Sequence, residues 1–95
     1  MIRVVAHITA KPNKIDETRQ VLEGFIEPTR KEKGCNLYEL HQNLADPTDF
    51  TFIEEWESDE DLENHLQSHH IESAFSTIAE ICSAPPDVRR YQRLG

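Results

Sequence analysis

The sequence lacks long hydrophobic runs. No apolar stretch approaches the roughly 18 residues that a membrane-spanning helix needs, and the first residues, MIRVVAHITAK, lack the basic start and the long apolar core of a signal peptide. We therefore expect a soluble protein of the cytoplasm that does not associate with membranes.

Positive charge is absent from the middle of the chain. No lysine or arginine occurs between Gly34 and Val88, a stretch that carries 13 acidic residues, and the whole chain has a net charge of −8. Nucleic-acid binding depends on cations that neutralise phosphates. This charge distribution therefore argues against a nucleic-acid partner.

Glycine and cysteine are both scarce. With three glycines, the chain holds no glycine-rich phosphate loop and no dinucleotide-binding fingerprint, and it also lacks GxSxG and HExxH motifs. The two cysteines, Cys35 and Cys82, have no CxxC spacing, so we expect two buried, reduced thiols rather than a disulfide. The motifs thus indicate no cofactor.

The chain does contain a regular succession of strand and helix patterns. Its 95 residues suffice for a single domain, 1–95, with one modest core. Alternating apolar residues predict four strands, at 2–10, 35–43, 50–57 and 87–94. The segment 45–49 contains Asp-Pro and is predicted to be the turn of an antiparallel hairpin between the second and third strands.

Helical patterns fill the two remaining stretches. The spacing of Ile15, Leu22 and Phe25 predicts one helix, capped by Asn13 and kinked near Gly24–Pro28 because proline lacks an N–H. After the third strand, Ser58 begins a capping box and a short helix that runs to about Gln67. Ser68 is predicted to cap a second piece, which ends at Pro85-Pro86 and has an apolar face made of Ile71, Phe75, Ile78 and Cys82.

The resulting order, β-α-β-β-α-β, is the ferredoxin-like pattern. It predicts an α+β fold with a four-stranded antiparallel sheet and helices on one face. No further helix is predicted that could cover the other face, so we expect a second copy of the chain to do so. The predicted assembly is a homodimer in the form of an α+β barrel.

Three of the five histidines, His65, His69 and His70, lie at the joint between the two helical pieces. His65 and His69 have a spacing that suits a metal on a continuous helix, but Ser68 is expected to break that helix, so we predict no metal site. The histidines could cap and hydrogen-bond the joint. Alternatively, one could face a pocket as a general base, because imidazole titrates near neutral pH.

Alternation places Phe52, Glu54 and Trp56 on one face of the third strand. A carboxylate between two aromatic side chains must be paired, hydrogen-bonded or held at a raised pKa. Glu54 is therefore either a structural anchor or an acid–base group of a site. Trp56 is either plain core or part of that site, and Tyr38 is either a rim residue of the core or a phenol donor into a cavity.

Taken in order along the chain, these residues resemble the antibiotic biosynthesis monooxygenase family of small dimeric proteins. The resemblance covers nearly the whole chain and depends on the ordered set rather than on one motif. The set comprises Glu27-Pro28-Thr29-Arg30, Gly34-Cys35, Tyr38-Glu39-Leu40, Asp46-Pro47-Thr48, Phe50, Glu54-Glu55-Trp56, His65-Leu66, His70, Pro85-Pro86, Arg89 and Tyr91. It implies a ferredoxin-like protomer, a dimeric barrel and a cavity between sheet and helices.

The resemblance also implies a function, the oxygenation of quinols, anthrones or similar electron-rich aromatics with O₂ and without metal or flavin. It implies that His65 or His70 is the catalytic base. The substrate would then be surrounded by Trp56, Tyr38, Glu54 and Phe52.

Two other functions stay open. One is a non-catalytic dimeric module that binds a small ligand. The other is an isomerase of a small phosphorylated dione, which would need a cluster of arginines, such as Arg89, Arg90 and Arg93, at the mouth of the pocket.

Overall fold

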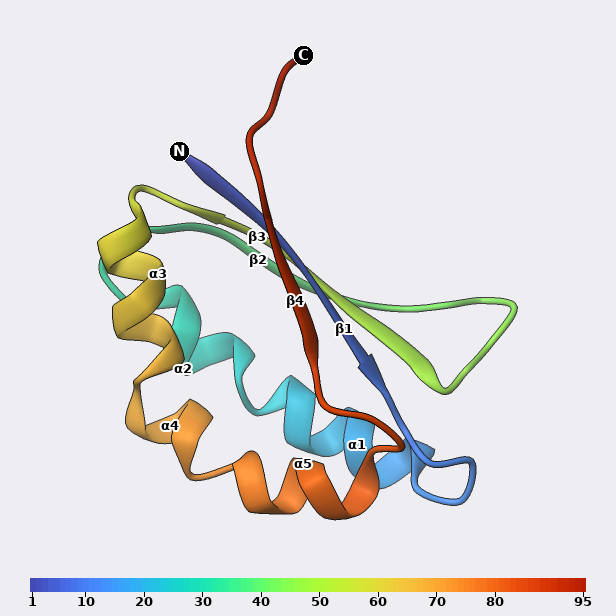
Figure 1. The fold of residues 1–95 in the computed structure, drawn as a ribbon. Coiled ribbons are helices and arrows are strands. Elements are labelled where there is room, and N and C mark those ends of the chain that lie inside the picture. Colours follow the sequence, from blue (N-terminus) through green and yellow to red (C-terminus); the bar gives the residue numbers. More distant parts are fainter.

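The computed structural model describes all 95 residues and contains a four-stranded antiparallel sheet in the order β2-β3-β1-β4, with every helix on the same face (Figure 1). The predicted ferredoxin-like α+β fold is confirmed. Along the chain the elements are β1 (Ile2–Thr9), α1 (Ile15–Glu23), α2 (Ile26–Arg30), β2 (Cys35–Gln42), β3 (Asp49–Trp56), α3 (Asp59–Leu66), α4 (His69–Glu72), α5 (Phe75–Ile81) and β4 (Asp87–Tyr91).

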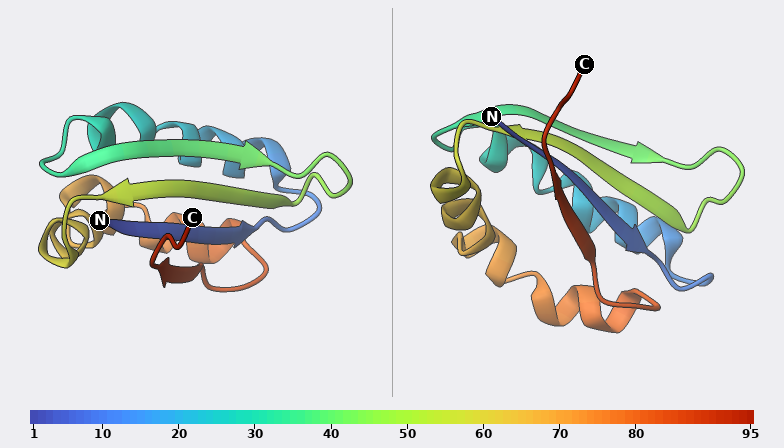
Figure 2. Two further views of the ribbon diagram at one scale, coloured as in Figure 1. Left: turned by 90° about the horizontal axis from the view of Figure 1, so that it is seen from above. Right: turned by 45° about the horizontal axis from the view of Figure 1, so that its top comes forward.

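The two central strands, β1 and β3, are paired along their whole length. Each inward residue of β1 lies opposite an inward residue of β3, as in the pairs Val4↔Glu54, Ala6↔Phe52 and Ile8↔Phe50. Figure 2 shows the four strands side by side, with the helices behind them. The pleat thus directs alternate side chains of both strands towards the helices, as the sequence alternation predicted.

The core lies between this inward face and the helical layer. Its fully buried side chains come from both layers, so neither the sheet nor the helices could form it alone. The most deeply buried of them are Val4, Leu22, Phe50, Trp56 and Leu62. Cys82 also belongs to the core, whereas Cys35 is only partly buried, and both are free thiols.

Local hydrogen bonds stabilise the two predicted turn and cap sequences. In the β2–β3 turn, the Asn43 side chain accepts from the backbone N–H of Ala45 at 2.8 Å, and the Asp46 side chain accepts from that of Thr48 at 3.1 Å. At the start of α3, the Ser58 hydroxyl accepts from the backbone N–H of Asp61 at 3.2 Å. The hairpin turn and the Ser58 cap are therefore confirmed.

The prediction of one kinked helix between β1 and β2 is wrong, because the chain forms two helices. The backbone N–H of Phe25 bonds to Leu22 one residue short of the α-helical spacing, at 3.1 Å, and Pro28 has no N–H to donate to Gly24. The predicted cap is also wrong, since the N-cap residue is Lys14 and no side chain caps this helix.

The second helical unit is divided into three helices, not two. The break after α4 contains a tight turn in which the Ala74 N–H bonds to Ile71 at 3.2 Å, and this turn changes the angular phase of the helix that follows. As a result Phe75, which was predicted to be apolar core, is 52% exposed. Ser68 is the N-cap residue of α4 as predicted, but its side chain donates instead to the His65 carbonyl, at 2.7 Å.

The last strand, β4, ends at Tyr91 rather than at Leu94. Tyr91 pairs with Arg3, close to the start of β1. Residues after Tyr91 therefore have almost no partner strand left, and a strand without a partner is not stable. None of the helices in the structure is long and apolar enough to span a membrane.

The position of Gly34, just before β2, depends on its lack of a side chain. Its φ is +81°, in the left-handed region, and a Cβ there would overlap the Asp61 side chain, with Cγ only 2.5 Å away. We predict that Gly34→Ala lowers the free energy of unfolding by about 2 kcal/mol or more, because left-handed backbone strain and the overlap add together. Urea denaturation measures this loss.

Gly24→Ala is the matched control. Gly24 has a helical φ of −65°, and its nearest contact for a Cβ is the Val21 carbonyl at 3.2 Å. Because alanine suits this backbone conformation, we expect a change below about 1 kcal/mol. Equal losses in the two variants would contradict the role given to Gly34.

Candidate functional site

The inward row of β3 brings two aromatic side chains and one carboxylate to the end of the sheet next to α3. Phe52, Glu54 and Trp56 are 2%, 4% and 0% exposed, which confirms that they share the buried face. The Trp56 indole N–H donates to Glu54 Oε1 at 2.8 Å. Glu54 therefore lies inside the core, with the indole as its hydrogen-bond partner.

Burial changes the acidity of Glu54. Loss of hydration raises the pKa of this carboxyl from 4.5 to about 7, and the negative charge of Glu32 adds to the rise, while the Trp56 hydrogen bond opposes it. Near neutral pH the group is therefore divided between its acid and carboxylate forms. A carboxyl in this state can donate or accept a proton.

Tyr38 of β2 lies beside Glu54 in the sheet and is buried. Its ring stacks on Phe52 at a centroid distance of 4.8 Å. Burial, and then the charge of Glu54, raises the pKa of the phenol well above its ordinary value. Of the two predicted roles, rim residue or donor into a cavity, the structure places Tyr38 in the core among the site residues, with its phenol protonated.

His65 lies on the buried face of α3 and meets the sheet. Its ring centroid is 4.7 Å from that of Trp56, and the His65 and Tyr38 rings meet edge to face with centroids 5.6 Å apart. His65 is only 3% exposed. Because desolvation disfavours the imidazolium, burial lowers the pKa of His65, and the hydrogen bond with Glu32 opposes this effect.

His70, on α4, lies next to His65, with ring centroids 6.1 Å apart. Its Nε2 lies 2.9 Å from the Thr29 hydroxyl of α2. The third histidine of the joint, His69, is exposed and takes no part in the cluster. The fold thus brings His65 and His70 together and separates both from His69.

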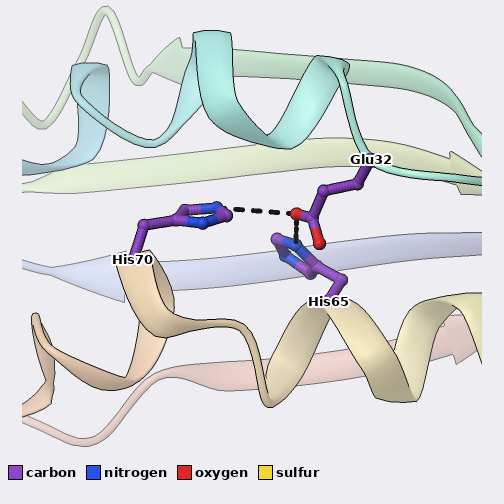
Figure 3. Close-up of side chains that lie close together, drawn as sticks. All are labelled: Glu32, His65 and His70. Carbon is purple, nitrogen blue, oxygen red and sulfur yellow. Dashed lines mark hydrogen bonds and ion pairs between the residues drawn. The ribbon is translucent and has the colours of Figure 1, made fainter.

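Glu32 connects the two inward histidines, and the sequence analysis missed it. Its Oε1 is 2.7 Å from His65 Nδ1 and 3.5 Å from His70 Nε2 (Figure 3). Glu32 stands between two lysines in the turn after α2, where a glutamate is normally solvated. No local pattern distinguishes it, and only the packing of α2 against α3 and α4 gives it this role.

The Glu32–His65 hydrogen bond selects one form of the neutral imidazole. A carboxylate can only accept, so Nδ1 of His65 must carry the proton and Nε2 keeps the lone pair. A neutral imidazole held in one tautomer by a carboxylate is the usual arrangement of a general base.

Side chains of the protein are packed closely where a cavity beside His65 and Trp56 was expected, since Trp56 is 0% and His65 3% exposed. None of the five main surface pockets is lined by His65, His70 or Trp56. One pocket of about 370 Å³ lies elsewhere, between the end of α5 and Pro85-Pro86. In this closed arrangement the side chains of Glu32 and His70 are the accessible edge of the cluster, at 21% and 24% exposed.

Fold and site together define a small ferredoxin-like α+β protein with a partly buried Glu–His–His cluster beside a tryptophan and a tyrosine. The sequence profile described as antibiotic biosynthesis monooxygenase matches residues 1–77. The chain therefore belongs to the antibiotic biosynthesis monooxygenase family, and the predicted resemblance is confirmed.

The names of two similar proteins are consistent with membership of this family. Probable quinol monooxygenase YgiN of Escherichia coli is 35% identical over an alignment 90 positions long, and the match covers 82% of this chain and 85% of YgiN. An uncharacterized protein of Synechocystis is 28% identical over 91 residues, and the chain spans 62% of that longer protein and 96% of its own length. A crystal structure of an antibiotic biosynthesis monooxygenase matches with a TM-score of 0.92 at 28% identity and covers 100% of both chains.

The raised pKa of Glu54 makes stability depend on pH. Because the folded pKa of about 7 lies above the ordinary 4.5, folding is weakened as pH rises from 4.5 to 7, by on the order of 3 kcal/mol in full. Below pH 4.5 the carboxyl is protonated in both the folded and the unfolded state, so its ionisation no longer affects stability. Glu54→Gln keeps an acceptor for Trp56 but cannot ionise.

We therefore expect the unfolding free energy of the original chain, relative to Glu54→Gln, to fall between pH 4.5 and 8. Urea titrations of both proteins across this range measure the difference. Glu80→Gln, on the exposed side of α5, is the matched control and should leave the pH dependence unchanged. A constant difference between the original chain and Glu54→Gln would contradict a raised pKa.

Proposed function

We propose that the protein is a cofactor-independent monooxygenase that oxidises a small electron-rich aromatic, of quinol or anthrone type, with O₂. The observation that carries the proposal is the orientation of His65, whose Nδ1 is held by Glu32 at 2.7 Å while its ring lies against Trp56. The name of the relative YgiN, a probable quinol monooxygenase, supports the substrate class.

In the proposed mechanism His65 Nε2 removes a proton from a phenolic O–H or an activated C–H of the substrate. The anion transfers one electron to O₂, which gives a substrate radical and superoxide. These recombine through a C–O bond, and the resulting peroxide anion takes the proton back from His65 to give a hydroperoxide, which loses water and leaves a quinone carbonyl. One O₂ is consumed, one of its oxygens enters the product and the other leaves as water.

The other residues would orient the substrate and exclude water. Trp56 and Phe52 offer flat apolar surfaces for an aromatic ring. Tyr38, whose phenol stays protonated, and Glu54, whose pKa is about 7, can each donate a hydrogen bond to a substrate oxygen. His70, hydrogen-bonded by Thr29, is the second candidate for the base.

Substrate binding requires the site to open, because the side chains of the site are packed against one another. The partly exposed edge formed by Glu32 and His70 offers the shortest path. α4 spans only His69–Glu72 and ends at a turn on each side, so an outward movement of this short helix would uncover His65 with little change to the sheet.

The filled interior also favours a second function, the non-catalytic dimeric module. The isomerase has less support, because the predicted cluster of arginines is not formed at the site. Arg89 pairs with Asp87, Arg90 pairs with Asp59 and Glu63, and Arg93 bonds to the Gly95 carbonyl.

Oxygen uptake by the metal-stripped protein with a panel of quinols and anthrones tests the monooxygenase, against the autoxidation blank. We expect saturable uptake, and a loss of about 100-fold or more in kcat/KM for His65→Ala. His69→Ala is the matched control, because that histidine is exposed and outside the cluster, and should retain full activity. Full turnover by His65→Ala/His70→Ala would rule out both histidines as the base, and absence of uptake would favour the binding module.

We also propose that the protein is a cytoplasmic homodimer in which a second copy covers the open face of the sheet. The two free cysteines suit a reducing compartment. On the open face Val5 of β1 pairs with Ile53 of β3, and both are only half-buried. The ion pair Arg3–Glu55, at 3.0 Å, lies one row away on the same face. An apolar centre with charged surroundings is typical of subunit interfaces.

Ile53→Lys should convert the dimer to a monomer, because it places a charge at the centre of the covered face. Light scattering coupled to size-exclusion chromatography measures the mass. Gln20→Lys, on the exposed side of α1, is the matched control and should leave the mass unchanged. A monomeric original chain, or a dimeric Ile53→Lys, would contradict this arrangement.

A further inference from the structure

The atoms that form the candidate base also have the composition of a metal site. Three donor atoms, one each from Glu32, His65 and His70, all lie within 4.8 Å of one another. They are directed at a common point from three separate segments, α3, α4 and the turn after α2 (Figure 3). Two imidazoles and one carboxylate are a common donor set for divalent transition metals.

Two of the three separations between donor atoms are close to those that a metal requires, and the two imidazole nitrogens, which lie within 4.8 Å of each other, reach the same separation by moving closer together. Ligand bonds of about 2.0–2.1 Å at tetrahedral angles place donor atoms roughly 3.3 Å apart. Glu32 Oε1 is 2.7 Å from one imidazole nitrogen and 3.5 Å from the other, values on either side of that separation. The side chains can therefore reach this geometry by small rotamer adjustments.

We propose that Glu32, His65 and His70 form a binding site for a divalent metal of the Zn²⁺ class. The metal would occupy the space in which the Nδ1 proton of His65 is now shared with Glu32. Exposed His69 offers one donor, and the surface pairs His41–Glu39 and His7–Asp49 offer two each, so these groups would bind the metal more weakly.

Metal binding would also switch off the proposed base, an inference that depends on the proposed function. In the metal-free cluster Nδ1 of His65 carries the proton and Nε2 the lone pair. A metal bound to Nδ1 needs a lone pair on Nδ1 itself, so the ring changes tautomer: its proton leaves Nδ1 and Nε2 carries one instead, and the number of protons on the ring stays the same. Nε2 then can only donate, and the substrate proton has no acceptor. The geometry thus points to reversible inhibition by Zn²⁺.

Binding is tested without substrate. The chelator-treated protein is titrated with Zn²⁺ by calorimetry, and with Co²⁺ by visible absorption, whose intensity reports a four-coordinate site. We expect one metal per chain, and at least about tenfold weaker binding for Glu32→Gln and for His70→Ala. His69→Ala, adjacent to His70 in sequence, is the matched control and should bind as the original chain does. Thermal unfolding of each variant without metal confirms that it is folded.

Either of two binding results would overturn the site. One is no binding by the folded original chain. The other is equal binding by the original chain, Glu32→Gln and His70→Ala, which would assign the metal to surface groups. His70→Ala keeps the test valid if a variant at the more deeply buried His65 fails to fold.

The switch is tested separately by oxygen uptake with and without one equivalent of Zn²⁺. We expect saturating Zn²⁺ to abolish the uptake and a chelator to restore it. Metal bound at the cluster with uptake unchanged would overturn the switch. A protein that binds Zn²⁺ but never consumes O₂ would contradict the monooxygenase and leave the metal site established.

Discussion

The rest of the site depends on the pleat of β3, which directs every second side chain of one central strand into the core. The strand is paired on both sides, so it cannot slip by one residue without exposing its whole apolar face. The same constraint that buries Phe50, Phe52 and Trp56 must also bury Glu54. An ionisable group is thus placed in the apolar interior by strand geometry.

Two deeply buried ionisable groups of the site, Glu54 and His65, each have a partner that reduces the cost of burial. Glu54 accepts from the Trp56 indole at 2.8 Å, and His65 bonds to Glu32 at 2.7 Å. Leaving a buried polar group without such a bond lowers the free energy of unfolding by about 1–3 kcal/mol. The partners also define chemistry, because an acceptor on one nitrogen of His65 decides which nitrogen is free. Stability and reactivity therefore depend here on the same hydrogen bonds.

The sheet and the helical layer contribute differently to the candidate site. A ferredoxin-like sheet with helices on one face leaves the other face open, and the half-buried Val5 and Ile53 lie there. The helical layer, by contrast, is divided into five short helices, and its breaks direct individual residues inwards or outwards. The regular layer thus supplies the scaffold, and the irregular layer supplies the Glu32, His65 and His70 side chains.

The sequence by itself determined the element order, the hairpin, the Ser58 cap and the buried row of β3, because each depends on local periodicity or on a side chain close by in the chain. The helix breaks were harder to predict, because one i→i−3 turn rotates every later side chain about the helix axis. Such a turn before α5 placed Phe75 on the surface. Only the tertiary structure decided that His65 and His70 face inwards while His69 does not. It alone assigned Glu32, 33 residues before His65, because packing between distant segments leaves no periodic signal in the sequence.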